Sequence, residues 1–219
     1  MNKESKFVIL EGPGRSGKTT QMGYIENLLT GSGMEKGKDF VVTREPGGVP
    51  ESEEIRKLIF YLVGENLIGP EGQTTLYFTA RKFWLEKLVE PSLEKGMTVI
   101  TDRCDTTTAA FQGYGEGGDM NQISGFSKAI MGKLKADAVI LLDIDLETMM
   151  QRNVDDETDP FDKKGPDFQQ RVIDGYREMA ENSWGGMKWY TIDGRKSKEE
   201  VSKEIKEVLE EILGKKLHD

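Results

Sequence analysis

The sequence predicts a three-layer α/β/α fold, in which helices cover both faces of a five-stranded parallel sheet. Five short apolar stretches recur along the chain, at residues 7–10, 40–42, 97–100, 138–142 and 189–192. They are continuous rather than alternating, which is typical of strands buried on both faces. Stretches with helical spacing of apolar residues separate them. This alternation predicts parallel strands joined by helices.

The expected helices are recognised from apolar residues that repeat every three or four positions. A long helix is expected over about residues 72–95. The last helix should begin at Ser197, because Ser197 and Glu200 have the spacing of a capping box. The first two helices carry their apolar residues at Met22, Ile25, Leu28 and Leu29, and at Ile55, Leu58, Ile59 and Leu62.

The length and composition limit the classes of protein to consider. A chain of 219 residues predicts one domain spanning residues 1–219. The net charge is −9, and no basic run with interleaved aromatics occurs, so we expect no nucleic-acid partner. A lone Cys104 and a lone His218 argue against disulfides and a His/Cys zinc site. Without a signal-peptide-like or membrane-spanning apolar stretch, we expect a cytoplasmic protein that does not contact membranes.

Residues 12–21, GPGRSGKTTQ, contain the phosphate-loop pattern G-x-x-x-x-G-K-[ST] between an expected strand and an expected helix. In such loops backbone N–H groups surround phosphate oxygens, Lys18 reaches the β and γ phosphates, and the Thr19 hydroxyl ligates Mg²⁺. The pattern predicts ATP or GTP binding but does not distinguish a kinase from a motor, a GTPase or a regulatory switch. The expected nucleotide contacts are Gly12, Pro13, Gly14, Arg15, Ser16, Gly17, Lys18, Thr19 and Thr20.

Two arginines stand where expected strands end. Arg44 follows the second strand, in TREPGG, and Arg103 follows the third, in VITDR. Ligands bind at the carboxyl ends of strands in open α/β sheets, so both arginines can face the phosphate loop. The alternative is local ion pairing, of Arg44 with Glu45 and of Arg103 with Asp102 or Asp105.

Tyr77 and Arg81 lie four residues apart on the long expected helix and therefore share a face. An aromatic ring followed by an arginine at this spacing can stack on a flat base and hold a phosphate or a base edge. The alternative is that Tyr77 belongs to the core and that Arg81 passes Leu85 on its way to solvent.

Taken in order, FVILEGPGRSGKTTQ, TREPGG, TLYFTAR, VITDRCDTTTAAFQG and VILLDID resemble the thymidylate kinase family, which phosphorylates dTMP to dTDP with Mg·ATP. The resemblance covers essentially the whole chain. It implies a P-loop NTPase fold with a short lid, a dTMP kinase acting in dTTP synthesis, and Mg²⁺ as cofactor. It also implies ATP and dTMP as ligands and a homodimer formed through helices on one sheet face.

The resemblance also implies roles for the acceptor side. Arg44 and Arg103 correspond to arginines that grip the acceptor monophosphate. Tyr77 stands in the place of a phenylalanine that stacks on thymine. Arg81 corresponds to an arginine that hydrogen-bonds the base edge.

Five further positions match family residues. Thr107 and Gln112 belong to the segment that closes over the base. Phe111 corresponds to the aromatic beside C2′ of the sugar, which disfavours a ribose hydroxyl. Asp102 resembles the acid near Mg²⁺ or the transferred phosphoryl group, and we expect it to be catalytic. Arg152 resembles an arginine that packs on adenine.

Phosphoryl transfer needs a cation near the transferred group. Residues 153–166, NVDDETDPFDKKGP, are polar and contain Pro and Gly, so we expect a mobile lid. It contains Lys163 and Lys164 but no arginine. The family divides into members with a lid arginine and members with one in the phosphate loop, so Arg15 is predicted to be the transition-state cation. The alternatives are an Arg15 that pairs with a nearby acid, and a lid lysine that reaches the phosphates on closure.

Four positions depart from the family pattern, and two of them, Gly14 and Tyr77, leave the acceptor open. Gly14 stands where the family usually has an acid that contacts the 3′-hydroxyl or organises Mg²⁺. Tyr77 adds a hydroxyl and Thr107 replaces a serine, while Asp159-Pro160 replaces Asp-Arg of some members. A kinase for dUMP or a 5-modified pyrimidine nucleotide is therefore one alternative. A nucleotide-binding module without transfer activity is another, although Lys18 and the acceptor arginines are all present.

Overall fold

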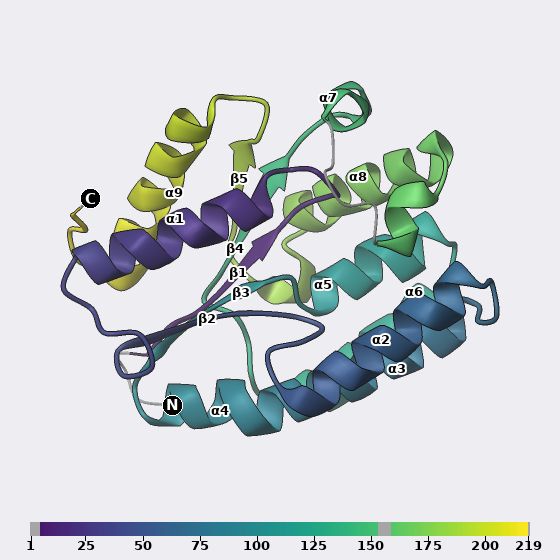
Figure 1. Ribbon diagram of the computed structural model, residues 1–219, viewed down its shortest axis with the longest axis horizontal. Coiled ribbons are helices and arrows are strands. Elements are labelled where there is room, and N and C mark those ends of the chain that lie inside the picture. Colours follow the sequence, from purple (N-terminus) through teal and green to yellow (C-terminus); the bar gives the residue numbers. More distant parts are fainter. Residues whose placement is uncertain (1–4, 153–158, 219) are drawn as a thin grey trace.

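A computed structural model describes residues 5–152 and 159–218. In these residues five parallel strands form one sheet in the order β2-β3-β1-β4-β5, as Figure 1 shows. The central strand pairs on both sides, with Val8 opposite Ile100 and Ala138. The predicted fold class is confirmed. The strands are β1 (Phe7–Glu11), β2 (Phe40–Arg44), β3 (Thr98–Asp102), β4 (Ala138–Asp143) and β5 (Trp189–Asp193).

One face of the sheet is covered by α1 (Lys18–Gly31) and α9 (Lys198–Leu213), which lie together in Figure 1. Their apolar residues pack on Val8, Leu10 and other strand residues. The predicted capping box is present: Ser197 Oγ accepts from the backbone N–H of Glu200, and the Glu200 carboxylate accepts from the backbone N–H of Ser197. The apolar residues predicted for the first helix, Met22, Ile25, Leu28 and Leu29, are all buried.

The opposite face is covered by the helices between β2 and β3 and by those that follow β3 and the lid. The expected helix over 72–95 is present, but it begins at Pro70 and contains a π-helical turn. The helices on this face are α2 (Pro50–Gly64), α3 (Pro70–Trp84), η1 (Leu85–Val89), α4 (Glu90–Glu94), α6 (Met120–Met131) and α8 (Pro166–Glu181). Shorter elements are α5 (Asp105–Thr108), η2 (Ala109–Gly115), α7 (Leu146–Gln151), η3 (Pro160–Lys163) and η4 (Trp184–Gly186).

The expected lid falls partly on residues 153–158, which lie outside the described residues. Its second part differs from the expected mobile loop, because it forms η3 and begins α8. Phe161 in this segment is buried, with its ring centroid 5.6 Å from Phe111 and 6.2 Å from Phe168. One aromatic side chain therefore anchors this polar segment. The segment has no apolar periodicity from which the contact could be predicted.

Candidate active site

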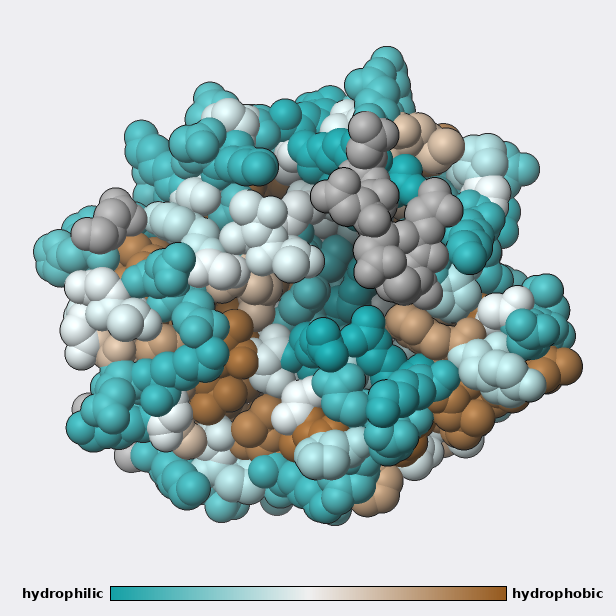
Figure 2. Space-filling model, in the orientation of Figure 1, coloured by the Kyte–Doolittle hydropathy of each residue, from teal (hydrophilic) through white to brown (hydrophobic). Residues whose placement is uncertain are grey.

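Two cavities lie at the carboxyl ends of β1, β2 and β3. The larger measures about 640 Å³ and is lined by the phosphate loop, and the smaller measures about 80 Å³ and lies beside α3 and η2. Asp102 and Arg103, which end and follow β3, line both cavities, as do Arg56 and Asp159. Figure 2 shows a hollow walled largely by hydrophilic residues on one face of the molecule. The sheet topology therefore brings the predicted donor and acceptor residues together.

The phosphate loop joins β1 to the beginning of α1. Gly12 and Gly17 adopt φ values of 150° and 96°, which favour glycine, and Arg15 adopts a left-handed φ of 62°. Lys18 Nζ donates hydrogen bonds to the main-chain oxygens of Gly12 and Pro13, both at 2.8 Å. No side chain caps α1. The loop thus offers phosphate a helix N-terminus and a lysine ammonium.

Lys18 is buried, and its charge is opposed by its surroundings. Burial, and next the positive charge of Arg103, lower the pKa of Lys18 to about 7, while Asp102 and Glu11 act in the opposite direction. A lysine in this state gains or loses its proton near neutral pH. The arrival of anionic phosphate would favour the charged form.

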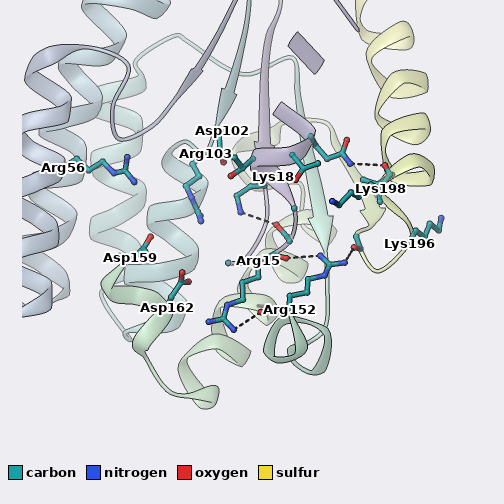
Figure 3. A pocket seen from close by; sticks show the side chains of 18 residues that line it. Arg15, Lys18, Arg56, Asp102, Arg103, Arg152, Asp159, Asp162, Lys196 and Lys198 are labelled. Carbon is teal, nitrogen blue, oxygen red and sulfur yellow. Dashed lines mark hydrogen bonds between the residues drawn. The ribbon is translucent and has the colours of Figure 1, made fainter. Parts of the chain in front are cut away.

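Arg15 extends from the loop toward the end of α7 (Figure 3). Its Nη1 donates to the main-chain oxygens of Met149 and Arg152, at 3.4 and 3.2 Å, and its buried Nε has no partner among the residues described. Within residues 5–152 and 159–218 it forms no ion pair, so pairing with a nearby acid, the alternative considered for this residue, is not observed there. Neutral carbonyls hold Arg15 at the edge of the larger cavity.

Arg152 links the phosphate loop to the connection after β5. Its Nη1 donates to the Arg15 main-chain oxygen at 3.0 Å, and its Nη2 donates to that of Gly194 at 2.6 Å. The guanidinium lines the larger cavity, as Figure 3 shows. Its predicted contact with adenine stays a prediction, and the structure adds a second role in bracing the loop.

Gly14 faces the lid. A Cβ built on Gly14 would come within 2.8 Å of Asp162 Oδ1, so a side chain here would meet the lid carboxylate. In Figure 3, Asp162 lies across the cavity from Lys18 and Arg103. Burial and Asp159 raise the pKa of Asp162, whereas Arg15 and Arg103 lower it. Asp162 therefore places a lid carboxylate close to the space that a side chain at position 14 would occupy.

Asp102 and Thr19 have the chemistry for a magnesium site. Asp102 Oδ1 is buried and has no hydrogen-bond partner in the part of the chain that the structure describes, and both residues line the larger cavity. In the described part of the chain no three His, Cys, Asp or Glu side chains form a metal cluster. Mg²⁺ in kinases is held by one or two protein oxygens together with nucleotide phosphates and water. Asp102 and Thr19 fit that pattern.

The two predicted acceptor arginines have different environments. Arg44 Nη2 donates to both carboxylate oxygens of Glu53, at 3.0 and 3.1 Å, rather than pairing with Glu45. Arg103 adopts a left-handed φ of 72° and places its guanidinium 5.1 Å from the Phe111 ring. Its Nη1 is buried without a partner, and among the described residues it forms no ion pair. Arg103 can therefore bind an anion where the two cavities meet.

The predicted base-binding residues divide into two groups. Tyr77, Thr107, Phe111 and Gln112 line the smaller cavity, although Tyr77 is also part of the packed core. Arg81 is different. It is fully buried and its Nη2 donates to Glu45 at 2.7 Å and to Thr108 Oγ1 at 3.0 Å. It does not line either cavity, and its contact with a base edge stays a prediction.

Glu11 is a site residue that sequence reasoning missed. Its fully buried carboxylate accepts from the Cys104 backbone N–H at 3.0 Å, the Thr107 hydroxyl at 2.7 Å and the Tyr176 hydroxyl at 2.8 Å. Burial raises its pKa, and Arg103 opposes that shift. The available signal was an acid at the end of a buried strand. Arg56, which lines both cavities, resembles an ordinary surface residue in the sequence.

Residues 10–205 match the profile of a family described as thymidylate kinase. The chain belongs to the thymidylate kinase family. The family and fold predicted from the sequence are thus confirmed.

Two relatives match this chain over nearly the full length of both proteins. The chain is 34% identical to the thymidylate kinase of Parasynechococcus marenigrum (strain WH8102), over 95% of this chain and 99% of that protein. It is 35% identical to that of Carboxydothermus hydrogenoformans, over 95% and 98% of the two chains.

A solved structure resembles the chain along nearly all of its length. The crystal structure of thymidylate kinase from Ehrlichia chaffeensis has a TM-score of 0.73 at 27% identity and covers 94% of this chain and 98% of that one. In residues 5–152 and 159–218 no helix has the length and apolar character needed to cross a membrane.

Proposed function

We propose that this protein transfers the γ-phosphoryl group of ATP to dTMP, producing ADP and dTDP. The observation that carries the proposal is the meeting of two cavities at Asp102 and Arg103. One cavity contains the phosphate loop. The other is bounded by Tyr77 and Phe111, whose flat rings suit a base. The phosphates of donor and acceptor would therefore meet beside the cation of Arg103.

Phosphoryl transfer depends on alignment and on positive charge, because negative charge spreads over the oxygens of the transferred group. Lys18 would exchange its two main-chain carbonyls for the β and γ phosphates. Arg103 would hold the acceptor phosphate through its unpartnered Nη1, and Arg44 would join after releasing Glu53. This arrangement would align the attacking oxygen with the γ phosphate.

Arg15 is the proposed transition-state cation. The described residues of the lid contain no arginine, and Arg15 lies at the mouth of the larger cavity. Its present partners are neutral carbonyls at the end of α7. Exchanging them for phosphate oxygens breaks no ion pair with the residues that the structure describes, and it gives the guanidinium anionic partners in place of neutral ones.

Asp102 and Thr19 would hold Mg²⁺, in agreement with the orphaned Oδ1 of Asp102. When bound, the ion neutralises charge on the β and γ phosphates. Asp102 also lies beside Lys18, whose charge it favours. Arg152 would contact adenine while it holds the loop through Arg15 and Gly194.

We further propose a single cytoplasmic domain over residues 1–219 that forms a homodimer through α2 and its neighbours. Leu58 and Tyr61 on α2 are 45% and 61% exposed, and Leu67 just after it is 62% exposed. Apolar side chains gathered on one helix face favour association. Sedimentation measurements would test the dimer.

The test is acceptor-dependent ADP release from ATP with dTMP, dUMP, ribo-TMP, dCMP and thymidine. We expect dTMP to be used best, and thymidine not at all, because the acceptor arginines require a phosphate. Ribo-TMP should be poor if Phe111 limits space at C2′. Release with none of these acceptors would contradict the proposed transfer reaction and favour a nucleotide-binding module.

A further inference from the structure

A chain of hydrogen bonds runs from the smaller cavity to the lid. Gln112, which lines that cavity, donates from Nε2 to Gln73 Oε1 at 3.1 Å. Gln73 Nε2 in turn donates to Glu116 Oε1 at 3.3 Å and to the Ile68 main-chain oxygen at 3.1 Å. The Lys164 ammonium, which precedes α8, donates to the same Glu116 oxygen.

The two ends of this chain dictate its direction. An ammonium only donates, and a carboxylate or a main-chain carbonyl only accepts. Gln73 must therefore turn its NH₂ group toward Glu116 and Ile68, and its oxygen toward Gln112. The Gln112 NH₂ group donates to that oxygen, which leaves Gln112 Oε1 to accept a hydrogen bond from a ligand. Both glutamines are almost fully buried, at 2% and 1% exposure, so water cannot easily replace a mismatched partner.

We propose that Glu116 is a positioning residue that, through Gln73, makes Gln112 present a carbonyl oxygen to the acceptor base. The inference rests on the proposed function. An acceptor oxygen at this point favours a base with a ring N–H, as in thymine or uracil. Cytosine has an unprotonated ring nitrogen there, and two acceptors would face each other. The network would therefore select 2,4-dioxopyrimidines.

Lys164 gives this network its link to the lid. Its ammonium lies 5.5 Å from the Phe161 ring centroid and 5.1 Å from that of Phe168, which fixes it above the aromatic cluster. The Glu116 side chain is 8% exposed, so its charge needs a nearby cation. Lys164 supplies that cation. The neighbouring Lys163 is exposed and provides a matched control.

The decisive variant exchanges the charges of the ion pair, E116K with K164E. It keeps an ion pair at the same place but puts a donor where Gln73 now meets an acceptor. Both glutamine side chains would then have to exchange the positions of their oxygen and their NH₂ group, although the Ile68 carbonyl opposes this change in Gln73. Gln112 would present NH₂ to the base. We expect the kcat/KM ratio of dTMP to 5-methyl-dCMP to fall at least tenfold, with the KM for ATP unchanged. These acceptors differ only at the N3–C4 edge.

Two controls separate polarity from general damage. E116Q keeps an acceptor oxygen for Gln73 and should retain the ratio within about threefold. K163E changes the charge beside Lys164 by the same amount as the K164E half of the exchange, and it should leave the ratio unaltered. Circular dichroism and the melting temperature would show that each variant is folded.

A folded E116K/K164E protein with the wild-type ratio would overturn the inference, because a merely structural ion pair predicts that result. Failure of the proposed function looks different: the wild-type protein would then phosphorylate none of the acceptors. In that case calorimetric Kd values for dTMP and 5-methyl-dCMP replace the kinetic ratio. An affinity ratio that the charge exchange does not change would equally overturn the inference.

Discussion

The donor and acceptor halves of the site hold their cations in different ways. On the donor side Lys18, Arg15 and Arg152 all donate to main-chain carbonyl oxygens. These partners carry only partial charge. The donor cations therefore stay available to an incoming polyphosphate.

On the acceptor side two of the three predicted arginines already hold carboxylates. Arg81 is paired with Glu45 in the core, with side-chain exposures of 0% and 1%, and Arg44 is paired with Glu53 near the surface. Arg103 is the exception, because its guanidinium lies 5.1 Å from the Phe111 ring centroid and its buried Nη1 has no partner among the described residues. Arg81 and Arg44 are thus fixed by carboxylates before substrate arrives, whereas the donor cations, which hold neutral carbonyls, are adjustable.

Removing Arg15, one of the adjustable cations, should have the largest effect on the reaction. For Arg15→Ala we expect kcat to fall by about 10³ to 10⁵, the contribution known for an arginine at the transferred phosphoryl group. The KM for ATP should change little, because Lys18 and the loop N–H groups remain. Steady-state kinetics with saturating dTMP would measure both values.

The matched control is Arg171→Ala. Arg171 also donates to a main-chain oxygen, that of Gly115 at 3.0 and 2.7 Å, but it does not line either cavity. Its turnover should stay within about threefold of wild type. Equal losses in both variants would mean that Arg15 acts by bracing the fold rather than on the phosphoryl group.

Breaking the fixed pairs should affect stability unequally. Glu45→Ala leaves the buried charge of Arg81 without its carboxylate, and we expect about 3 to 5 kcal/mol lower free energy of unfolding. Glu53→Ala removes the partner of Arg44, whose side chain is 55% exposed, and should cost about 0.2 to 1 kcal/mol. Urea denaturation would measure both. Similar losses would show that burial does not distinguish the two pairs.

The smallest expected effect is a change in the protonation of Lys18 when ATP binds. Burial and Arg103 lower the pKa of Lys18 to about 7, so the free protein carries mostly neutral Lys18 above that pH. Bound phosphate favours the ammonium and raises this pKa. ATP binding should therefore take up about one proton near pH 8.5, and ATP affinity should weaken as the pH rises above about 7.

Calorimetric titration in buffers of different ionisation enthalpy would measure that proton. Lys18→Arg is the control, because arginine stays charged throughout this range and should abolish the uptake. Proton uptake that persists in Lys18→Arg would have to come from another group. The comparison between adjustable and fixed cations would then lose its support on the donor side.

Local patterns in the sequence predicted the fold and the donor loop well. The five apolar stretches are all strands, each extended by the structure to a polar or charged residue at its carboxyl end. The structure of residues 159–166 was predicted less well. Phe161 lies in a polar segment, and its burial depends on contacts with Phe111 and Phe168. A single aromatic has no periodicity, and its partners are distant in the chain.

The sequence by itself determined the phosphate loop, because Gly12, Gly17 and Lys18 act through backbone conformation and a neighbouring helix terminus. These are short-range properties that nearby residues control. It also indicated which arginines reach the carboxyl edge of the sheet, since parallel strands end at the same side.

Only the tertiary structure decided what those arginines hold and how the base pocket is lined. Glu45 lies 36 residues from Arg81, and Glu116 lies 43 residues from Gln73. Hydrogen bonds act over a few ångströms, and contacts of that range between distant segments exist only once the helices have packed on the sheet. Charge partners and amide polarity are therefore properties of the packed fold, while the loop that receives the phosphate is a property of the chain.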